Sequence, residues 1–182
     1  MICAALLAGG IGTRLDVGMP KQFYLIADKP ILIHSLEAFL KVEEMDEIIV
    51  SSPKECINKT KDVIKEYELT DPRITVIEGG KRRSDTILNS INYTLENDYP
   101  KDSIMVTHDA ARIFVTPQLI KDSVRYAKQY GAASAVIPAT DVIFESKKQG
   151  ILTDVPDRQY LLQSQTPQSF NINHYLEIYS DV

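Results

Sequence analysis

Apolar runs alternate along the chain with segments that carry apolar residues at helical spacing. Residues 1–7 form a short apolar run that ends at a glycine pair, which is typical of a buried parallel strand. Residues 29–45 place Ile33, Leu36 and Leu40 on one stripe with charges between them, which predicts an amphipathic helix. The same reasoning predicts strands at 1–7, 46–53, 73–80, 103–112 and 132–146, and helices at 29–45, 56–67, 83–97, 116–131 and from 173 onward.

This repeated alternation predicts an α/β fold with a doubly wound, mainly parallel sheet of the Rossmann-like type. Ligands bind such sheets outside the carboxyl ends of the strands. Gly9-Gly10 follows the first predicted strand, and Gly79-Gly80 and His108-Asp109 lie at the carboxyl ends of two others. We therefore expect these three strand ends to converge on one cleft.

Local signals predict where two of the helices begin and end. Ser84 or Asp85 is expected to cap the helix at 83–97, and Gly131 is expected to close the helix at 116–131.

The pattern changes at residues 145–168, which show no helical period and carry a turn signal at Gln149-Gly150. This segment is predicted to be an extended β-arm that lies either over the active site or on a partner subunit. The length of 182 residues predicts a single domain, 1–182. The last predicted helix stops at Val182 without a cap, so the chain is expected to be truncated there.

Composition and charge exclude several classes of protein. Apolar residues make up 44% and charged residues 25%, as in an ordinary globular protein, and the net charge of −5 argues against a nucleic-acid partner. Cys3 and Cys56 have neither metal-ligand nor disulfide spacing. No apolar stretch is long enough for a membrane span and no signal peptide is recognisable, so a cytoplasmic protein without a membrane partner is expected.

Three kinds of phosphate-binding loop compete for the sequence AGGIGTR. A Walker loop is excluded because Thr13-Arg14, and not Lys-Ser or Lys-Thr, follows Gly12. A dinucleotide fingerprint is disfavoured because Leu15 stands where a small residue is needed and no acidic residue ends the second strand. The remaining option is a strand-to-loop turn that holds a nucleoside triphosphate.

Physical chemistry favours that option. Glycines let the backbone approach the ligand closely and turn successive N–H groups toward it. Arg14 can grip phosphate oxygens in bidentate fashion, and Lys21 adds a point charge. We therefore assign Arg14 and Lys21 to the triphosphate.

The second glycine pair repeats this logic. Gly79 and Gly80 allow close approach of the backbone, and Ser84 or Thr86 offers a hydroxyl to a base or ribose. Of the basic run at 81–83, Arg83 is expected to face the ligand.

The fourth strand end carries the candidate metal ligand. Asp109 is expected to hold Mg²⁺, the hard cation that accompanies a triphosphate, and Arg112 to serve Asp109 or the ligand. His108 is expected to be a packed structural histidine, because no Ser or Cys nucleophile accompanies it.

Four motifs in order, LAGGIGTR…PKQF, EGGKRRSDT, THDAAR and QTPQSF, resemble the sugar- and polyol-phosphate cytidylyltransferases. The resemblance implies the nucleotidyltransferase fold, a homodimer that exchanges the arm, and attack of a polyol phosphate on CTP with release of pyrophosphate. It implies catalytic roles for Arg14 and Lys21, acceptor binding by Asp141 and Arg158, and Mg²⁺ on Asp109. It places CTP against Ala8, Gly9, Gly10, Gly12, Gly80 and Thr86.

The acceptor implied first is D-ribitol 5-phosphate, because residues 152–171 resemble that branch of the family. The alternative is 2-C-methyl-D-erythritol 4-phosphate, the acceptor of the branch that serves isoprenoid biosynthesis. Two further hypotheses stay open: a nucleotidyltransferase for another base or sugar phosphate, and a truncated chain that binds nucleotide without turnover.

Overall fold

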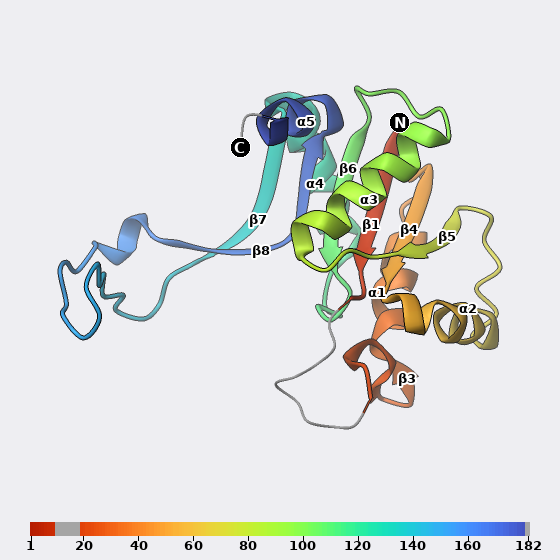
Figure 1. The fold of residues 1–182 in the computed structure, drawn as a ribbon, viewed down its shortest axis with the longest axis horizontal. Coiled ribbons are helices and arrows are strands. Elements are labelled where there is room, and N and C mark those ends of the chain that lie inside the picture. Colours follow the sequence, from red (N-terminus) through yellow and green to blue (C-terminus); the bar gives the residue numbers. More distant parts are fainter. Residues whose placement is uncertain (10–18, 181–182) are drawn as a thin grey trace.

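A computed structural model describes residues 1–9 and 19–180 of the chain (Figure 1). The strands are β1 Ile2–Leu7, β2 Leu25–Ile26, β3 Lys29–Pro30, β4 Glu47–Ser52, β5 Ile74–Glu78, β6 Ile104–Asp109, β7 Ala132–Pro138 and β8 Leu162–Asn171. The α-helices are α1 Ile31–Leu40, α2 Ile57–Glu66, α3 Arg83–Glu96, α4 Pro117–Tyr130 and α5 Ile172–Ser180, and short 3-10 helices cover Lys21–Phe23, Lys54–Cys56 and Arg158–Tyr160.

The described strands form a six-stranded sheet in the order β5-β4-β1-β6-β8-β7, beside a small β2-β3 hairpin. Strands β5, β4, β1 and β6 pair in parallel, whereas β8 runs antiparallel to both β6 and β7. The expected doubly wound, mainly parallel α/β sheet is confirmed.

Hydrophobic side chains cover the sheet on both faces because successive strand residues point to opposite sides. Along β1, Ala4 and Leu6 join the cluster formed with α1, α2 and α4. Cys3 and Ala5 join the cluster formed with α3 and α5. This two-sided burial explains why β1 reads as a continuous apolar run.

Helix ends agree with the sequence in one case and differ in the other. Gly131 closes α4 with a φ of 86°, as expected. Helix α3 begins two or three residues earlier than the predicted caps Ser84 or Asp85 would place it, because Arg82 is the N-cap residue. Asp85 contributes from inside the first turn instead, where its carboxylate accepts the Arg82 backbone N–H at 3.1 Å.

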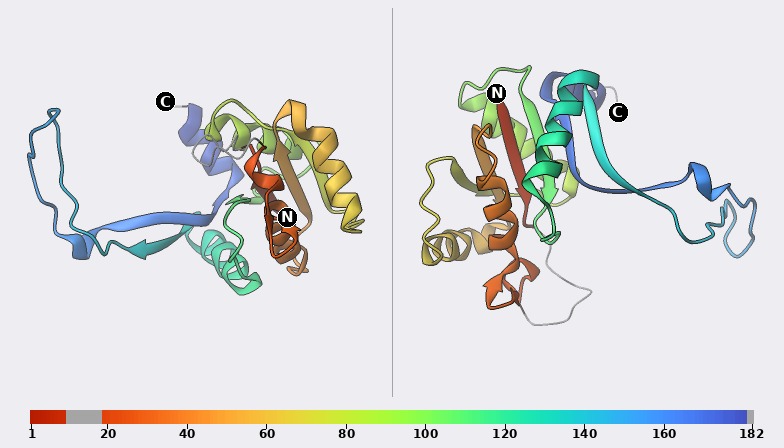
Figure 2. Two further views of the ribbon diagram at one scale, coloured as in Figure 1. Left: turned by 90° about the horizontal axis from the view of Figure 1, so that it is seen from below. Right: turned by 180° about the vertical axis from the view of Figure 1, so that it is seen from behind.

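An arm is present, and its carboxyl-terminal limb is strand β8, which runs from the arm into the sheet (Figure 1). Residues 162–171, expected partly within the arm, form β8, of which residues 162–164 pair with β7 alone and residues 168–171 pair with β6. The projecting segment consists of residues 139–161 and the outer ends of β7 and β8, and it leads away from the sheet in all three ribbon views (Figures 1 and 2). Near its tip, Lys148 bridges Ile151 around Gly150, so the predicted turn is confirmed.

Candidate active site at the carboxyl ends of the parallel strands

The ends of the parallel strands are tied together by backbone hydrogen bonds. Ala8 N–H donates to Ser51 O at 2.9 Å, and Gly79 N–H donates to Ser52 O at 2.8 Å. On the other side of β1, Ala110 N–H donates to Leu7 O at 3.2 Å. The residues that follow β1, β5 and β6 thus lie along one edge of the sheet, where ligands of α/β folds bind.

Asp109, the last residue of β6, lies between two guanidinium groups. Arg112 Nε donates to its Oδ2 at 3.0 Å, and Arg83 Nε lies 3.5 Å from its Oδ1. All three side chains are roughly one-third to one-half exposed, with values of 35% for Asp109, 43% for Arg112 and 45% for Arg83. The structure therefore brings the predicted metal ligand and the predicted ligand-facing arginine together, within reach of solvent.

The segment Gln165–Gln168 of β8 completes this cluster, and its role was missed by reasoning from the sequence. Gln165 and Gln168 accept hydrogen bonds from Arg112 and Arg83, respectively. Between them, Thr166 Oγ1 accepts the Asp109 backbone N–H at 3.3 Å. The motif QTPQ was visible, but nothing in a polar strand indicates which side chains lie across from it.

Gly80 allows the backbone after β5 to pass close to the start of α3. Its N–H donates to Thr86 Oγ1 at 2.9 Å, and a Cβ at this position would lie 2.3 Å from Asp85 Cβ. The Thr86 hydroxyl also donates to Arg82 O at 3.1 Å, and the residue is only 5% exposed. In this structure the Thr86 hydroxyl hydrogen-bonds to the backbone of the turn before α3. Its contact with cytidine stays a prediction.

We expect Gly80→Ala to lower the free energy of unfolding by about 1–3 kcal/mol, because the new methyl group would force the backbone of α3 to move. Urea unfolding measures this loss. Gly79→Ala is the matched control, since a Cβ there would meet its nearest atom at 3.4 Å, an ordinary contact. Equal loss in the two variants would contradict the prediction.

His108 is a packed structural residue, as expected. It is fully buried, and its Nδ1 and Nε2 lie 2.9 Å from Thr166 Oγ1 and 3.1 Å from Arg112 O. Burial lowers the pKa of His108 from 6.5 to about 4, although the hydrogen bond to Arg112 O opposes this shift. The ring is therefore neutral at pH 7 and links β8 to the loop after β6.

The lowered pKa of His108 predicts a loss of stability in acid. The unfolded chain binds the proton more tightly, so the stabilisation is complete above pH 6.5 and is lost as the pH falls toward about 4. Between pH 7.5 and 5 we expect a contribution of about 2 kcal/mol to the fall in unfolding free energy. Urea unfolding at both pH values should show this fall reduced in His108→Gln, and an unchanged fall in the variant would contradict the assignment.

The other predicted nucleotide contacts lie partly outside the described residues. Ala8 is buried at the end of β1, Gly9 is exposed beyond it, and Lys21 is half-buried at the start of a 3-10 helix. Gly10, Gly12 and Arg14 lie outside the described residues. Their assignment to the triphosphate stays a prediction.

The two predicted acceptor residues lie on the arm. Asp141 is exposed, and Arg158 Nη1 donates to Thr140 O at 3.0 Å within the arm itself. Among the described residues, neither contacts the cluster around Asp109. A single chain therefore does not bring the predicted acceptor residues to the predicted metal ligand.

The side chains at the strand ends fit a divalent cation that takes most of its ligands from the substrate. Within residues 1–9 and 19–180, no group of three or more His, Cys, Asp and Glu side chains could hold a metal ion. Mg²⁺ commonly uses one or two carboxylates together with water and substrate phosphates. Asp109 fits that role, and it would have to share the cation with a bound triphosphate.

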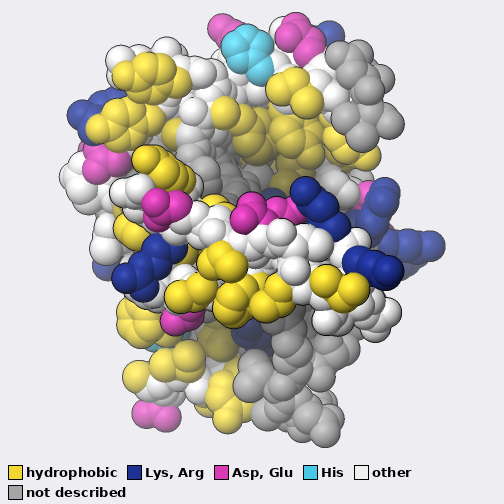
Figure 3. All heavy atoms as spheres, turned by 90° about the vertical axis from the view of Figure 1, so that its left-hand side faces the viewer, with side chains coloured by type: hydrophobic (Ala, Val, Ile, Leu, Met, Phe, Trp, Pro, Cys, Tyr) yellow, Lys and Arg dark blue, Asp and Glu magenta, His cyan; other side chains and the backbone are white. Residues whose placement is uncertain are grey.

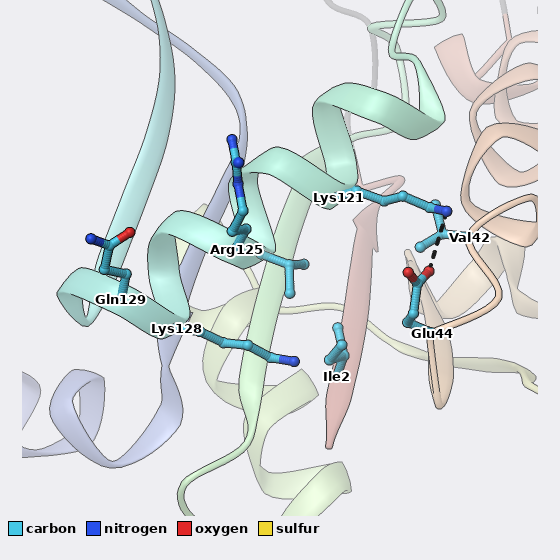
Figure 4. Close-up of a pocket in the computed structure, with 8 residues that line it drawn as sticks. Ile2, Val42, Glu44, Lys121, Arg125, Lys128 and Gln129 are labelled. Atoms are coloured by element: carbon cyan, nitrogen blue, oxygen red, sulfur yellow. Dashed lines mark ion pairs between the residues drawn. The ribbon is translucent and has the colours of Figure 1, made fainter.

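A separate hollow of about 460 Å³ lies at the opposite edge of the sheet, between α4 and the residues after α1. Figure 4 shows Lys121, Arg125 and Lys128 of α4 around it, with Lys121 paired to Glu44 at 3.5 Å. Ile2, at the amino end of β1, lines this hollow. The hollow is therefore separate from the cluster at the carboxyl ends of the strands. None of the described helices has the length and apolarity that crossing a membrane requires.

The sheet order and the strand-end cluster define an α/β fold of the nucleotidyltransferase class. Residues 2–181 match the family model of 2-C-methyl-D-erythritol 4-phosphate cytidylyltransferase, and the chain belongs to that family. It is therefore a cytidylyltransferase, as the four motifs predicted.

Solved structures agree in fold. The 4-diphosphocytidyl-2C-methyl-D-erythritol synthase of Anaerococcus prevotii is 22% identical with a TM-score of 0.80, over 100% of this chain and 77% of that one. The 2-C-methyl-D-erythritol 4-phosphate cytidylyltransferase of Francisella tularensis is 23% identical with a TM-score of 0.75, over 100% of this chain and 81% of that one. The counterpart from Thermus thermophilus is 22% identical with a TM-score of 0.69, over 100% of this chain and 76% of that one.

These comparisons change the order of the two expected acceptors. D-ribitol 5-phosphate was the first expectation, from the likeness of residues 152–171 to that branch. The family model and the similar structures name the methylerythritol enzyme instead and give no support to ribitol.

Proposed function

We propose that this chain transfers a cytidylyl group from CTP to 2-C-methyl-D-erythritol 4-phosphate, a step of isoprenoid biosynthesis. The observation that carries this proposal is the match of the family model over residues 2–181. The cluster of Asp109, Arg83 and Arg112 at the strand ends supports it, because it offers the charges that a triphosphate and a second phosphate need.

In the proposed reaction, a phosphate oxygen of the acceptor attacks the α-phosphorus of CTP. The bond from that phosphorus to the bridging oxygen of the β-phosphate breaks, and pyrophosphate leaves with the electron pair. No protein nucleophile takes part, so the chain contributes position and charge. Arg14 and Lys21 are assigned to the triphosphate, and Gly80 to the cytidine.

Asp109 is proposed to hold Mg²⁺, which neutralises phosphate charge when bound. Arg83 and Arg112, which pair with Asp109, are close enough to exchange its carboxylate for substrate phosphates as their partners. A cation on Asp109 would repel them, and phosphate oxygens offer them new partners.

The arm is proposed to complete the site of a second copy of the chain. Many of its large apolar side chains are more than half exposed, an arrangement that marks a surface covered by a partner. They are Val142, Phe144, Leu152, Val155 and Tyr160. Figure 3, which looks onto the end of the arm, shows hydrophobic side chains among charged ones there. A homodimer would cover this surface and carry Arg158 toward the partner's Asp109.

The proposal is tested by pyrophosphate release from CTP and Mg²⁺, with methylerythritol 4-phosphate and ribitol 5-phosphate in parallel reactions. Release with the methylerythritol acceptor alone, lost in Arg14→Ala, would support it. Release with ribitol 5-phosphate alone would restore the first expectation from the sequence. CTP binding without release in either reaction would favour a chain that binds nucleotide without turnover.

A further inference from the structure

We propose that Gln165 and Gln168 are positioning residues, which hold the guanidinium groups of Arg112 and Arg83 on the two sides of Asp109. This inference rests on the proposed function, because it assigns the glutamines a role in presenting those charges to phosphate. Both glutamines belong to β8, which continues directly from the arm.

Each arginine approaches a carboxylate oxygen of Asp109 with its Nε and donates from an Nη group to a glutamine amide oxygen. Arg83 Nη2 donates to Gln168 Oε1 at 2.8 Å, while its Nε faces Asp109 Oδ1. Arg112 Nη1 donates to Gln165 Oε1, while its Nε donates to Asp109 Oδ2. Each arginine thus contacts both Asp109 and one end of the four-residue segment 165–168.

The amide of Gln168 is itself held in place. Its Nε2 donates to Ser164 Oγ at 2.9 Å, which leaves Oε1 directed at Arg83. The backbone is anchored as well, since Thr107 Oγ1 donates to Gln168 O at 3.1 Å. Because long side chains lose entropy when they are ordered, a fixed acceptor lowers the cost of keeping Arg83 in place.

Neutral acceptors suit this task better than carboxylates would. An amide oxygen accepts an arginine N–H without cancelling the positive charge, so the charge stays available to a phosphate. When a cation and phosphates occupy the neighbourhood of Asp109, the arginines can leave the carboxylate and keep their bonds to the glutamines. The glutamines therefore fix where the charges stand while Asp109 changes partners.

The holding contacts can be tested without substrate. In the ligand-free protein, NMR of the arginine Nη–H groups, which make the bonds to the glutamines, reports how fast each one exchanges with water. We expect Gln168→Ala to speed exchange at Arg83 about tenfold and to leave Arg112 unchanged, with the reverse pattern in Gln165→Ala. Unchanged exchange in both variants, or equal acceleration at both arginines, would overturn the inference.

Kinetics test whether the contacts matter to catalysis. We expect Gln168→Ala by itself to lower kcat/KM about tenfold. In a double variant with Arg83→Ala, it should lower kcat/KM no further than Arg83→Ala alone does. Gln168→Glu, which keeps the reach but adds a negative charge, should lower kcat/KM more than Gln168→Ala does. Additive losses in the double variant, or a Gln168→Glu enzyme better than Gln168→Ala, would indicate a merely structural role and overturn the inference.

Gln129→Ala is the matched control, because Gln129 lies on α4 beside the hollow at the other edge of the sheet. It should change neither exchange nor kcat/KM. The exchange measurement also separates two kinds of failure. If the unaltered chain binds CTP but transfers it to no acceptor, the proposed function fails, while arginine exchange still decides whether the glutamines hold the arginines.

Discussion

Asp109→Asn is expected to lower kcat/KM for cytidylyl transfer by roughly 10²–10³-fold, a loss comparable with removal of one key electrostatic contact in a transition state. An asparagine side chain keeps the size of Asp109 but loses the charge that would hold a divalent cation and orient Arg83 and Arg112. The loss is measured as pyrophosphate release over a range of Mg²⁺ concentrations. Higher Mg²⁺ should restore part of the activity if the main defect is weaker binding of the cation.

Asp122→Asn is the matched control for this variant. Asp122 also pairs with an arginine three residues away, with Arg125 Nη2 at 2.9 Å from its Oδ1, but it lies on α4. Exposed pairs of this kind contribute little to stability, so both variants should fold normally. An Asp109→Asn enzyme with the activity of the control would remove Asp109 from the proposed mechanism.

Arg158→Ala is expected to lower activity by a similar factor, and the lost activity should return partly in mixed dimers. If Arg158 serves the partner's site, co-expression of Arg158→Ala with Asp109→Asn gives dimers in which one site has both native residues. Statistical pairing makes half of the dimers mixed, so about one quarter of the sites should be intact. Pyrophosphate release by the co-expressed mixture, compared with each variant alone, measures this recovery.

The recovery distinguishes two places for Arg158. If the arm folded over the active site of its own chain, each of the two sites in a mixed dimer would lack either Arg158 or Asp109. Activity would then not return. The control for expression and pairing is co-expression of two Arg158→Ala chains that differ only in their tags. A protein that sedimented as a monomer would contradict the proposed exchange of the arm directly.

Much of the fold could be predicted because its signals are local. The apolar run of β1, the glycine after α4 and the turn at Gly150 each reflect the chemistry of a few neighbouring residues. The rule that ligands gather at the carboxyl ends of parallel strands also predicted that Asp109 and Arg83 would share one site. Asp141 and Arg158, in contrast, came from family resemblance alone.

Local sequence patterns sufficed for most of the elements, for their alternation and for the residue types available at each strand end. Long-range pairing placed residues 168–170 of β8 between β6 and β7, and brought Gln165 and Gln168 beside arginines distant in sequence. Strand β8 is held largely by backbone hydrogen bonds to β6 and β7, and these depend little on which side chains the strand carries. Without an apolar period, nothing local to such a strand indicates its neighbours or its register.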